Sequence, residues 1–571
     1  MDNSLKAKFL RLFARIGRGV RHNAGFIFLF FILNYLTMAW SLAEEDKFEV
    51  MIGYGFTLFF FSLLLTAGLY LLHHDRLRSV LKMLLIIICA IPFFVEVFSM
   101  YNYKALIGIG IINAILETNS KEAVEFIQMY FGFKEYAGII LLIVLLYVGW
   151  KKRWLNKIKT SYHLQSRILA IVLLISICYT FRMLTVYIDF LYGDLLPVQR
   201  TFNSLSVSYE NMKAYKELSS QVAVDVKLTS NDSKIKNVVF ILGESMNRNH
   251  MQLYGYYLPN TPFLQELADK GEVCVFSDIV SPHSTTVAVL TKLFTFSDYE
   301  SEKPWYKYNN LIDIMNSAGY RTHWLSNQES SGIWGNVAQI YANHSTMHKF
   351  TRIRDSYEDK GYLDEELFPL LEEARRDDGK SEKNFYVLHL MGGHGLYYNR
   401  YPYIFHKFRE NDIQLELNEH AKEIVAQYDN ALYYNDYIVT KIMDQFRNDE
   451  ALVIYLPDHG EAVYDEQGFA GHLEENPSRH MMEIPMVIWA SDKFKEKYPD
   501  KWQQISNSVD RPYMTDDMIH TILDLIDVKT EEFDASRSIV NDKFDSKRKR
   551  IFNELDYDTQ IKTGNIPEDK K

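Results

Sequence analysis

ALVIYLPDHG, residues 451–460, is an apolar run that ends abruptly in Asp458, His459 and Gly460. A short apolar run of this kind is typical of a strand that is buried on both faces of a parallel sheet. Asp and Gly are common turn residues, so the polar end has a plain structural explanation. Open α/β sheets, however, bind ligands at the carboxyl ends of their strands, and a carboxylate beside an imidazole is half of a metal site.

Further segments repeat the pattern of an apolar run that ends in polar residues. They are KNVVFILGES (236–245), RTHWLSNQ (321–328), NFYVLHLMGGHG (384–395) and EIPMVIWAS (483–491). Helical stretches separate the strands, which predicts a parallel sheet with helices on both faces. The carboxyl ends of such strands share one edge. We therefore expect a set of distant side chains to converge there: Glu244, Asn327, His394, Asp458 and His459.

The composition of the 571-residue chain changes at about residue 191. Long apolar runs dominate before that point, and Asp, Glu, Lys and Asn occur throughout the remainder. The net charge of −11 gives no support for nucleic-acid binding, which usually requires a basic domain. Cys274 is the one cysteine of the polar part, so that part holds no internal disulfide.

Five apolar runs come near the roughly 20 residues that span a bilayer core. They are residues 24–43, 50–72, 79–100, 136–150 and 166–190. Basic flanks alternate with non-basic ones, and basic flanks face the cytoplasm. We therefore expect five transmembrane helices within residues 1–191, with the N-terminus inside and everything after the fifth helix outside the cytoplasmic membrane.

The same topology places NAILETNSKEAVEF, residues 113–126, on the outer side. This segment is either a solvated amphipathic helix or a polar patch that faces the active site, where a lipid headgroup would lie. Residues 192–232 form an amphipathic connector that suits a membrane surface. We expect a catalytic domain over 233–540 and a polar tail over 541–571 that is at the surface or partly disordered.

Glu244, Asp458 and His459 offer the oxygen and nitrogen ligands that zinc prefers, with one position left for a reacting group. The segment HSTT, residues 283–286, supplies a cluster of hydroxyls before an apolar helical stretch. A hydroxyl at a helix N-terminus lies where phosphate binds well, and zinc lowers the pKa of a hydroxyl. Ser and Thr also favour this position as helix caps, and the two roles are compatible.

Four motifs resemble the phosphoethanolamine transferases of Gram-negative bacteria. They are NVVFILGES…LYGY…NTPFL, LHLMGGHGLYYNRYP, YLPDHGEAVYDE and GHLEENPSRHMMEIPMVIW. The resemblance covers nearly the whole chain, although GES replaces the more frequent GET. It implies an inner-membrane enzyme with five transmembrane helices and an α/β/α periplasmic domain of the alkaline-phosphatase/sulfatase-like fold.

The resemblance also implies roles for the residues. Glu244, Asp458 and His459 bind zinc, and a threonine is both a zinc ligand and the nucleophile. Matching the spacing to Phe294 selects Thr286, with Thr285 as the alternative.

Five more positions match residues of the family. His394 matches the histidine that contacts the phosphoethanolamine group, and His472 a second-site or proton-transfer histidine. Asn327 matches a substrate-contacting position, and Thr118 and Glu122 match outer-loop residues that hold the ethanolamine head.

The implied reaction moves phosphoethanolamine from phosphatidylethanolamine to the threonine, and from there to lipid A or the core oligosaccharide. The lack of a disulfide resembles the branch that modifies core sugars, and the acceptor stays open between the two. If the acceptor is a lipid A phosphate, the added ethanolamine offsets its charge, which bears on polymyxin resistance.

Three other interpretations compete with this one. A phosphoglycerol transferase of the lipoteichoic-acid-synthase type shares the architecture, but the ETNSKEA and MGGHGLYYNRYP matches disfavour it. A sulfatase needs Cys-x-Pro-x-Arg, whereas Cys274 is followed by Val-Phe-Ser. A non-catalytic membrane sensor would bind no metal and gives no reason for Glu, Thr, Asp and His to converge.

Overall fold

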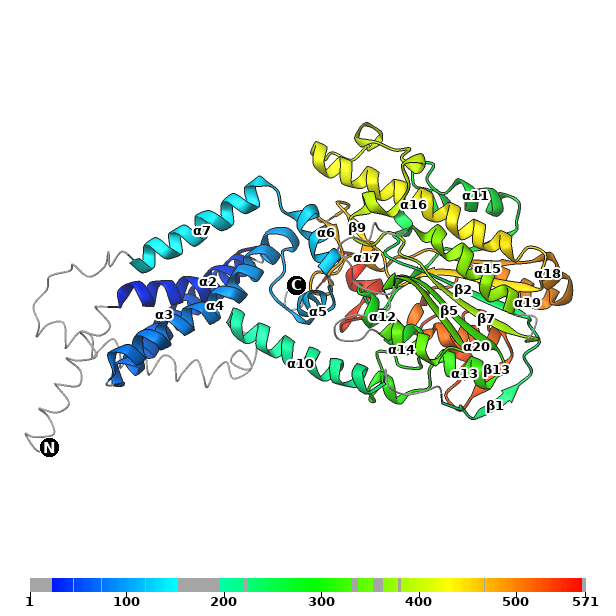
Figure 1. Cartoon of the computed structure of the whole chain (residues 1–571), viewed down its shortest axis with the longest axis horizontal. Coiled ribbons are helices and arrows are strands. Elements are labelled where there is room, and N and C mark those ends of the chain that lie inside the picture. Colours follow the sequence, from blue (N-terminus) through cyan, green and yellow to red (C-terminus); the bar gives the residue numbers. More distant parts are fainter. Residues whose placement is uncertain are drawn as a thin grey trace, which may run out of the picture. The chain divides into compact units, whose positions relative to one another are not determined.

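The computed structural model describes most of the chain (Figure 1). The described residues are 23–44, 46–72, 74–118, 120–151, 196–218, 224–329, 337–352, 363–377, 381–466 and 468–566. The chain divides into two compact units, residues 1–112 with 130–208 and residues 113–129 with 209–571. The segment 113–129, which the expected boundary at residue 191 places with the apolar helices, groups with the second unit.

Apolar helices dominate the first unit. They are α2 (Ala24–Glu44), α3 (Phe48–Leu71), α4 (Asp75–Tyr103) and α7 (Phe133–Lys151). Within the part of the chain that the structure describes, three helices are long and apolar enough to cross a membrane: 24–44, 48–70 and 75–103. The fourth expected span lies in α7, and the fifth, 166–190, lies outside the described residues. Large apolar side chains such as Phe28 and Ile91 are exposed on these helices, as lipid-facing residues are.

A buried ion pair joins α4 to the helix α10 (Pro197–Leu218). Arg200 donates from Nε and Nη2 to the two carboxylate oxygens of Glu96, both at 2.7 Å. The hydroxyl of Thr37 on α2 donates to the same carboxylate, and the backbone N–H of Ile107 donates to it at 3.3 Å. Four donor groups from three segments therefore satisfy one buried carboxylate, and the pair fixes the start of α10 against the helices of this unit.

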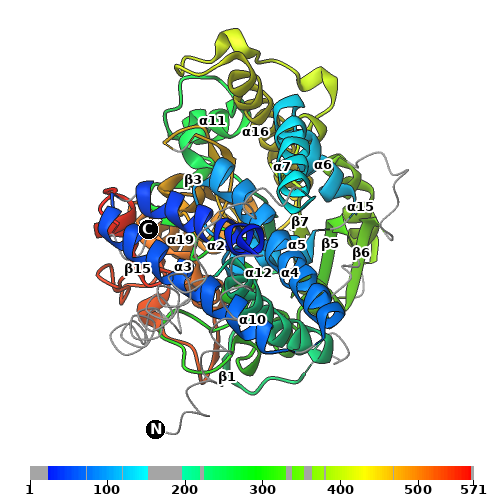
Figure 2. The same ribbon diagram turned by 90° about the vertical axis from the view of Figure 1, so that its left-hand side faces the viewer.

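A seven-stranded sheet forms the centre of the second unit, in the order β3-β11-β8-β2-β7-β5-β6. Its parallel strands are β2 (Asn237–Gly243), β5 (Arg321–Glu329), β6 (Met347–Arg352), β7 (Asn384–His389) and β8 (Ala451–Pro457). Figure 2 shows β3 and β6 towards opposite sides of this unit.

The expectation of a wholly parallel sheet is wrong at one edge. β11 (Met486–Ala490) runs antiparallel to β8, and β3 (Val273–Phe276) runs antiparallel to β11. A parallel neighbour needs a long crossover, usually a helix, and the helix in the connection from β8 to β11 is the single short turn α17 (Arg479–Met482). The carboxyl end of β11 consequently lies at the edge of the sheet away from the other strand ends.

Helices cover both faces of the sheet (Figure 1). On one face lie α12 (Thr286–Leu293), α13 (Leu311–Ser317), α14 (Val337–His344) and α20 (Met518–Leu525). On the other lie α11 (Pro262–Asp269), α15 (Leu367–Asp377) and α16 (Glu419–Gln445). Successive side chains of β2 point to opposite faces of the sheet and so contribute to a separate apolar core on each face. Phe240 packs with the first set of helices, and Val239 and Ile241 pack with the second.

Shorter elements complete the second unit. Residues 113–129, which include the segment 113–126 expected on the outer side and are called the outer segment below, contribute most of α6 (Ser120–Tyr130) and the end of α5 (Ile109–Glu117). The others are β1 (Leu228–Asn231), β4 (Ile279–Val280), β9 (Ala462–Val463), β10 (Ala470–Gly471), α18 (Asp492–Lys497), α19 (Pro499–Ser506), β12 (Tyr513–Met514) and β13 (Val528–Thr530). β1 pairs with β13, so the end of the expected connector is already part of the catalytic domain.

The expected polar tail is packed against the catalytic domain over its described residues. It forms a hairpin of β14 (Ile551–Phe552) and β15 (Leu555–Asp556), followed by a π-helical turn. Phe552, Leu555 and Tyr557 are buried in an apolar cluster with Val280 and other residues of the domain. Apolar residues spaced among many charges were too sparse to indicate this packing from the sequence.

Glu96→Ala is expected to lower the free energy of unfolding of the full chain by about 3–5 kcal/mol, because the guanidinium of Arg200 stays buried without its counter-charge. Glu96→Ala combined with Arg200→Met should recover most of the loss, since no buried charge remains. Thermal unfolding in detergent measures both changes. Glu44→Ala is the control, because its half-exposed partner Lys104 is solvated and stability should change little. Equal destabilisation by Glu44→Ala and Glu96→Ala would contradict the stabilising role of the buried Glu96–Arg200 pair.

Candidate active site

The carboxyl ends of β2 and β8 bring together two carboxylates and an imidazole. Glu244 follows β2 directly, and Asp458 and His459 follow β8. Their ligating atoms all lie within 4.8 Å of one another, and all three side chains are fully buried. Adjacent parallel strands deliver them to one edge of the sheet, so the convergence follows from the register in which Gly243 faces Pro457.

Hydrogen bonds orient Asp458 and His459 so that each keeps one buried atom without a partner among the described residues. Oδ1 of Asp458 accepts from the N–H groups of Ser245 at 3.2 Å and His459 at 2.7 Å. Nδ1 of His459 lies 2.8 Å from the Gly460 carbonyl, so Nε2 carries the lone pair. Oδ2 of Asp458 and Nε2 of His459 have no hydrogen-bond partner among the described residues, and they lie 3.4 Å apart. Two orphaned buried atoms of this kind fit a metal ion.

The electrostatics of the three residues also favour a cation. Burial raises the pKa of Glu244, and the neighbouring Asp458 raises it further. Burial likewise raises the pKa of Asp458, and burial lowers the pKa of His459 to about 4. A buried neutral imidazole beside two carboxylates leaves negative charge without compensation, which a divalent ion supplies. The three side chains therefore suit a divalent metal ion.

Close backbone contacts hold the loops around the metal-binding group. Gly392 has φ +47°, and a Cβ there would lie 2.5 Å from the carbonyl oxygen of Glu244. A Cβ on Gly460 would lie 2.3 Å from the carbonyl oxygen of His480. Ser245 takes the left-handed conformation with φ +56° although it is not glycine, a strained geometry that is common at functional sites. Its hydroxyl donates to Oε1 of Glu244 at 2.7 Å.

Thr286 is the hydroxyl residue of the HSTT segment that faces this group. It is the first residue of α12, and its Oγ1 donates to Oε2 of Glu244 at 3.1 Å. The preceding residues face elsewhere, because the N–H of Ser284 donates to Glu474 at 2.7 Å and Oγ1 of Thr285 lies 3.5 Å from the same carboxylate. Glu474 thus orients the segment so that Thr286 lies beside the metal-binding group.

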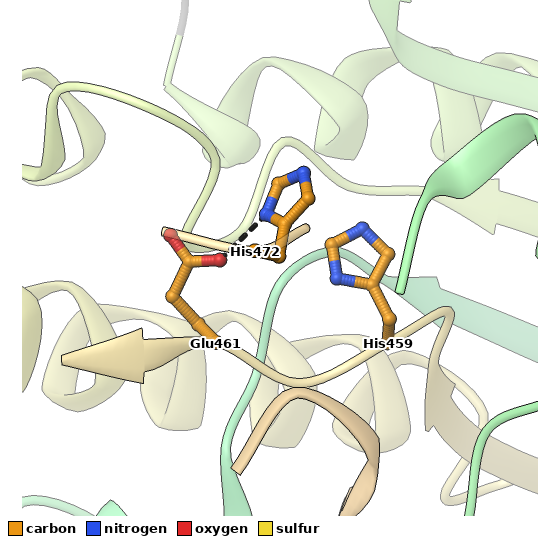
Figure 3. A group of neighbouring side chains, drawn as sticks. All are labelled: His459, Glu461 and His472. Atoms are coloured by element: carbon orange, nitrogen blue, oxygen red, sulfur yellow. Dashed lines mark hydrogen bonds and ion pairs between the residues drawn. The ribbon is translucent and has the colours of Figure 1, made fainter. Parts of the chain in front are cut away.

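His472 stands beside His459, with Glu461 on its other side (Figure 3). The ring centroids of the two histidines are 4.2 Å apart, and Nδ1 of His472 lies 2.7 Å from Oε2 of Glu461. The hydroxyl of Tyr397 donates to the other oxygen of Glu461 at 2.6 Å. Burial lowers the pKa of His472, but Glu461 outweighs it and raises the pKa to about 9. His472 is therefore a proton donor at neutral pH.

His394 lies in the loop after β7, near Glu244. Its N–H donates to Met391 O at 3.1 Å, and the N–H of Gly393 donates to Glu244 O at 2.9 Å. Burial lowers the pKa of His394, which is therefore neutral at pH 7. The buried carboxylate of Asp364 accepts from the N–H groups of Met391 at 2.8 Å and Gly392 at 3.0 Å, and so fixes the start of the loop.

Asn327 is not brought to the metal-binding group. Its Nδ2 donates to Asp364 at 2.8 Å, and its Oδ1 accepts from Thr351 at 2.7 Å. The next residue, Gln328, takes that place instead and donates from Nε2 to Glu244 Oε2 at 3.1 Å. Sequence reasoning missed Gln328, although its position at the end of β5 was the available signal. It also missed Glu461 and Glu474, which lie inside quoted motifs.

The outer segment 113–129 belongs to the same unit as these residues. Thr118 directly follows the helix α5, and its hydroxyl donates to the carbonyl of Ala114. Glu122 lies on α6, and its side chain is outside what the structure describes. Their contact with an ethanolamine head stays a prediction.

A buried histidine braces the loops behind the site. Nε2 of His250 lies 2.8 Å from Asp465, and its Nδ1 lies 3.3 Å from Asp429 on α16. Burial lowers the pKa of His250, but the two carboxylates outweigh it and raise the pKa to about 10. His250 is an imidazolium that holds the loop after β9 against α16 through Asp465 and Asp429.

Two family models match the chain. The model described as Sulfatase matches residues 236–528, about half of the chain. The model described as Phosphoethanolamine transferase EptA/EptB matches residues 58–189. The predicted sulfatase-like domain is thereby confirmed, and the count of five membrane-spanning helices stays a prediction.

Curated proteins resemble the chain over different shares of its length. Phosphoethanolamine transferase EptC of Escherichia coli (strain K12) is 26% identical over 495 residues, which cover 79% of this chain and 81% of that protein. Kdo(2)-lipid A phosphoethanolamine 7''-transferase of the same strain is 27% identical over 262 residues, 45% of each chain.

Solved structures share the fold. The C-terminal periplasmic domain of EcEptC from Escherichia coli, in complex with Zn, is 29% identical with a TM-score of 0.53, and the match covers 58% of this chain and 95% of that one. The integral membrane protein lipooligosaccharide phosphoethanolamine transferase A from Neisseria meningitidis is 20% identical with a TM-score of 0.65, over 90% of this chain and 98% of that one. The second likeness is one of fold.

Removal of metal by a chelator is expected to lower the melting temperature of the full chain, because the three buried ligands lose their counter-charge. Free metal at about 1,000 times its Kd stabilises the native state by about 4 kcal/mol. Thermal unfolding with and without added metal measures the shift. Asp458→Asn should abolish the shift, and Asp449→Asn, at the amino end of β8, should retain it. A full shift in Asp458→Asn would disprove the ligand assignment.

The His250 network predicts a loss of stability at alkaline pH. The folded pKa of about 10 exceeds the ordinary value of 6.5, so the stabilisation is fully present below pH 6.5 and is lost as the pH rises towards 10. The slope from this one group is about 1.4 kcal/mol per pH unit. Chemical unfolding between pH 6.5 and 10 measures it, and His250→Gln should flatten the profile. An unchanged slope in this variant would refute the imidazolium.

Proposed function

The chain belongs to the sulfatase family, and we propose that it is a phosphoethanolamine transferase that takes its group from phosphatidylethanolamine. The acceptor is lipid A or the core oligosaccharide of lipopolysaccharide. The single observation that carries the mechanism is the hydroxyl of Thr286, held 3.1 Å from a buried metal-binding carboxylate at the start of a helix. Backbone N–H groups at a helix start bind phosphate well.

Zinc is the proposed metal. Glu244, Asp458 and His459 would hold it together with the hydroxyl oxygen of Thr286, and oxygen and nitrogen ligands suit zinc. The zinc complex of the related EcEptC domain supports this choice. When bound, zinc lowers the pKa of the threonine hydroxyl and so makes an alkoxide accessible near neutral pH.

In the first step, Thr286 gives its hydroxyl proton to water, and Oγ1 attacks the phosphorus of phosphatidylethanolamine. An O–P bond to threonine forms, and the bond from phosphorus to the glycerol oxygen breaks. Diacylglycerol leaves with a proton from His472, whose imidazolium form is favoured by the carboxylate of Glu461 at 2.7 Å. Phosphoethanolamine remains covalently attached to Thr286.

In the second step, an oxygen of the acceptor attacks the same phosphorus. His394, which is neutral because burial lowers its pKa, takes the proton from the acceptor hydroxyl. The bond from phosphorus to Thr286 breaks and leaves the threonine alkoxide, and water carries the proton from His394 back to His472. Two histidines whose surroundings move their pKa values apart suit the roles of acid and base.

The membrane helices give a reason for the architecture, since the donor never has to leave the bilayer. We propose five transmembrane helices in the bacterial inner membrane and a catalytic domain in the periplasm. Thr118 and Glu122 of the outer segment would hold the ethanolamine head.

A phosphoglycerol transferase is the remaining alternative, and a non-catalytic sensor is a weaker one. The family model over residues 58–189 and the relatives named above favour phosphoethanolamine over phosphoglycerol. A buried metal-binding group beside an oriented hydroxyl disfavours the sensor.

Incubation with phosphatidylethanolamine in detergent is expected to add one phosphoethanolamine group to the wild-type chain and none to Thr286→Ala. Intact mass of the purified full chain measures the adduct, and Thr285→Ala is the matched control that should still gain it. A gain on Thr286→Ala would move the nucleophile elsewhere. A gain from phosphatidylglycerol alone would establish the phosphoglycerol transferase instead.

A further inference from the structure

A buried ion pair links the outer segment to the loop that carries His394. Glu125 on α6 and Arg400 lie 275 residues apart in the sequence, and Oε2 of the glutamate is 2.5 Å from Nη2 of the arginine. Their side chains are 8% and 3% exposed. A pair buried this deeply is rare unless it holds particular segments together, because both charges lose their hydration.

The same arginine holds the backbone of the catalytic histidine. Nε of Arg400 donates to the carbonyl oxygen of His394, while Nη2 reaches Glu125. Nδ2 of Asn399 donates to the other oxygen of Glu125 at 3.1 Å. The planar guanidinium thus spans two partners at once, which the single point charge of a lysine cannot do.

Gly395 allows the turn that follows His394. Its φ of +64° lies in the left-handed region that other residues rarely adopt, and Nη2 of Arg400 and Oε2 of Glu125 lie beside it. The chain therefore turns over the ion pair directly after His394. Asp364 anchors the loop before His394, and the pair anchors it after.

We propose that Glu125 and Arg400 are positioning residues that set His394 against the metal-binding group, so that group transfer depends on the outer segment 113–129. The pair acts through His394 and touches neither donor nor acceptor. The proposal rests on the proposed function for the role of His394, and extends it by making α6 a structural part of the catalytic machinery.

The physical consequence is a fixed distance between two parts of the site. Thr118 and Glu122, which we propose to hold the ethanolamine head, precede Glu125 on the same outer segment. The ion pair fixes the position of that segment relative to His394. A loss of the pair should therefore misplace the proton-transfer group relative to the phosphate, and a misplacement of about 1 Å costs on the order of 100-fold in rate.

The test compares Glu125→Gln and Arg400→Lys with the wild-type full chain in detergent. We expect kcat to fall about 10- to 100-fold with KM for phosphatidylethanolamine and zinc content unchanged. The double variant should lose no more than the worse single variant, because both changes break one unit. Asp449→Asn is the matched control: it removes a carboxylate 2.6 Å from Arg375 at the other edge of the sheet and should leave kcat unchanged.

A second readout is independent of activity. Hydrogen exchange of the amides over residues 391–397 should become about tenfold faster in Glu125→Gln, and should not change in Asp449→Asn. Wild-type kcat in Glu125→Gln, or unchanged exchange in this loop, would overturn the proposal. A wild-type chain without transferase activity would refute the proposed function instead, and the exchange experiment would still decide whether the pair positions the loop.

Discussion

The burial of negative charge at one edge of the sheet is the constraint on which the second unit depends. Two carboxylates and a neutral imidazole lie fully buried within 4.8 Å of one another. Such a group is stable only when a cation and a set of donors satisfy it. The donors come from all around the edge: Ser245 and Thr286 to Glu244, Gln328 to Glu244, and backbone N–H groups to Asp458. The glycines that flank these residues allow the backbones to approach closely enough.

The sequence predicted the part of this arrangement that depends on strand ends. An apolar run followed by Asp-His-Gly, and another followed by Gly-Glu-Ser, place their polar residues at one edge whenever the strands are parallel neighbours. The antiparallel direction of β11 was not predictable in the same way, because the apolar run EIPMVIWAS does not indicate which way the strand runs relative to its neighbours. The pairings of Gln328 with Glu244 and of Glu125 with Arg400 were also hidden, since each joins residues whose proximity only the tertiary structure creates. The packed tail was hidden because its few apolar residues are spread among charges.

Two buried ion pairs show how similar chemistry serves different ends. Glu96 and Arg200 lie within the first unit, and four donors satisfy the carboxylate there. Glu125 and Arg400 lie within the second unit, and the arginine shares its donors between a carboxylate and a backbone carbonyl. The first arrangement leaves the carboxylate fully satisfied and fixes the start of a helix. In the second pair, Nε of Arg400 donates to the backbone carbonyl of His394 while Nη2 donates to Glu125, so the pair fixes the position of His394.

The second unit is discontinuous in the chain, and this has a consequence for its biosynthesis. Residues 113–129 are made well before Arg400, and the contact between Glu125 and Arg400 closes a loop of 275 residues. Contacts of such high sequence separation form late, because the chain entropy lost in closing the loop precedes any gain. The domain core can condense around its own sheet, whereas α6 can join only once the polypeptide beyond residue 400 has folded. The nascent enzyme therefore cannot fix the position of His394 before residue 400 has been made, and a chain interrupted before that point carries an unfinished site.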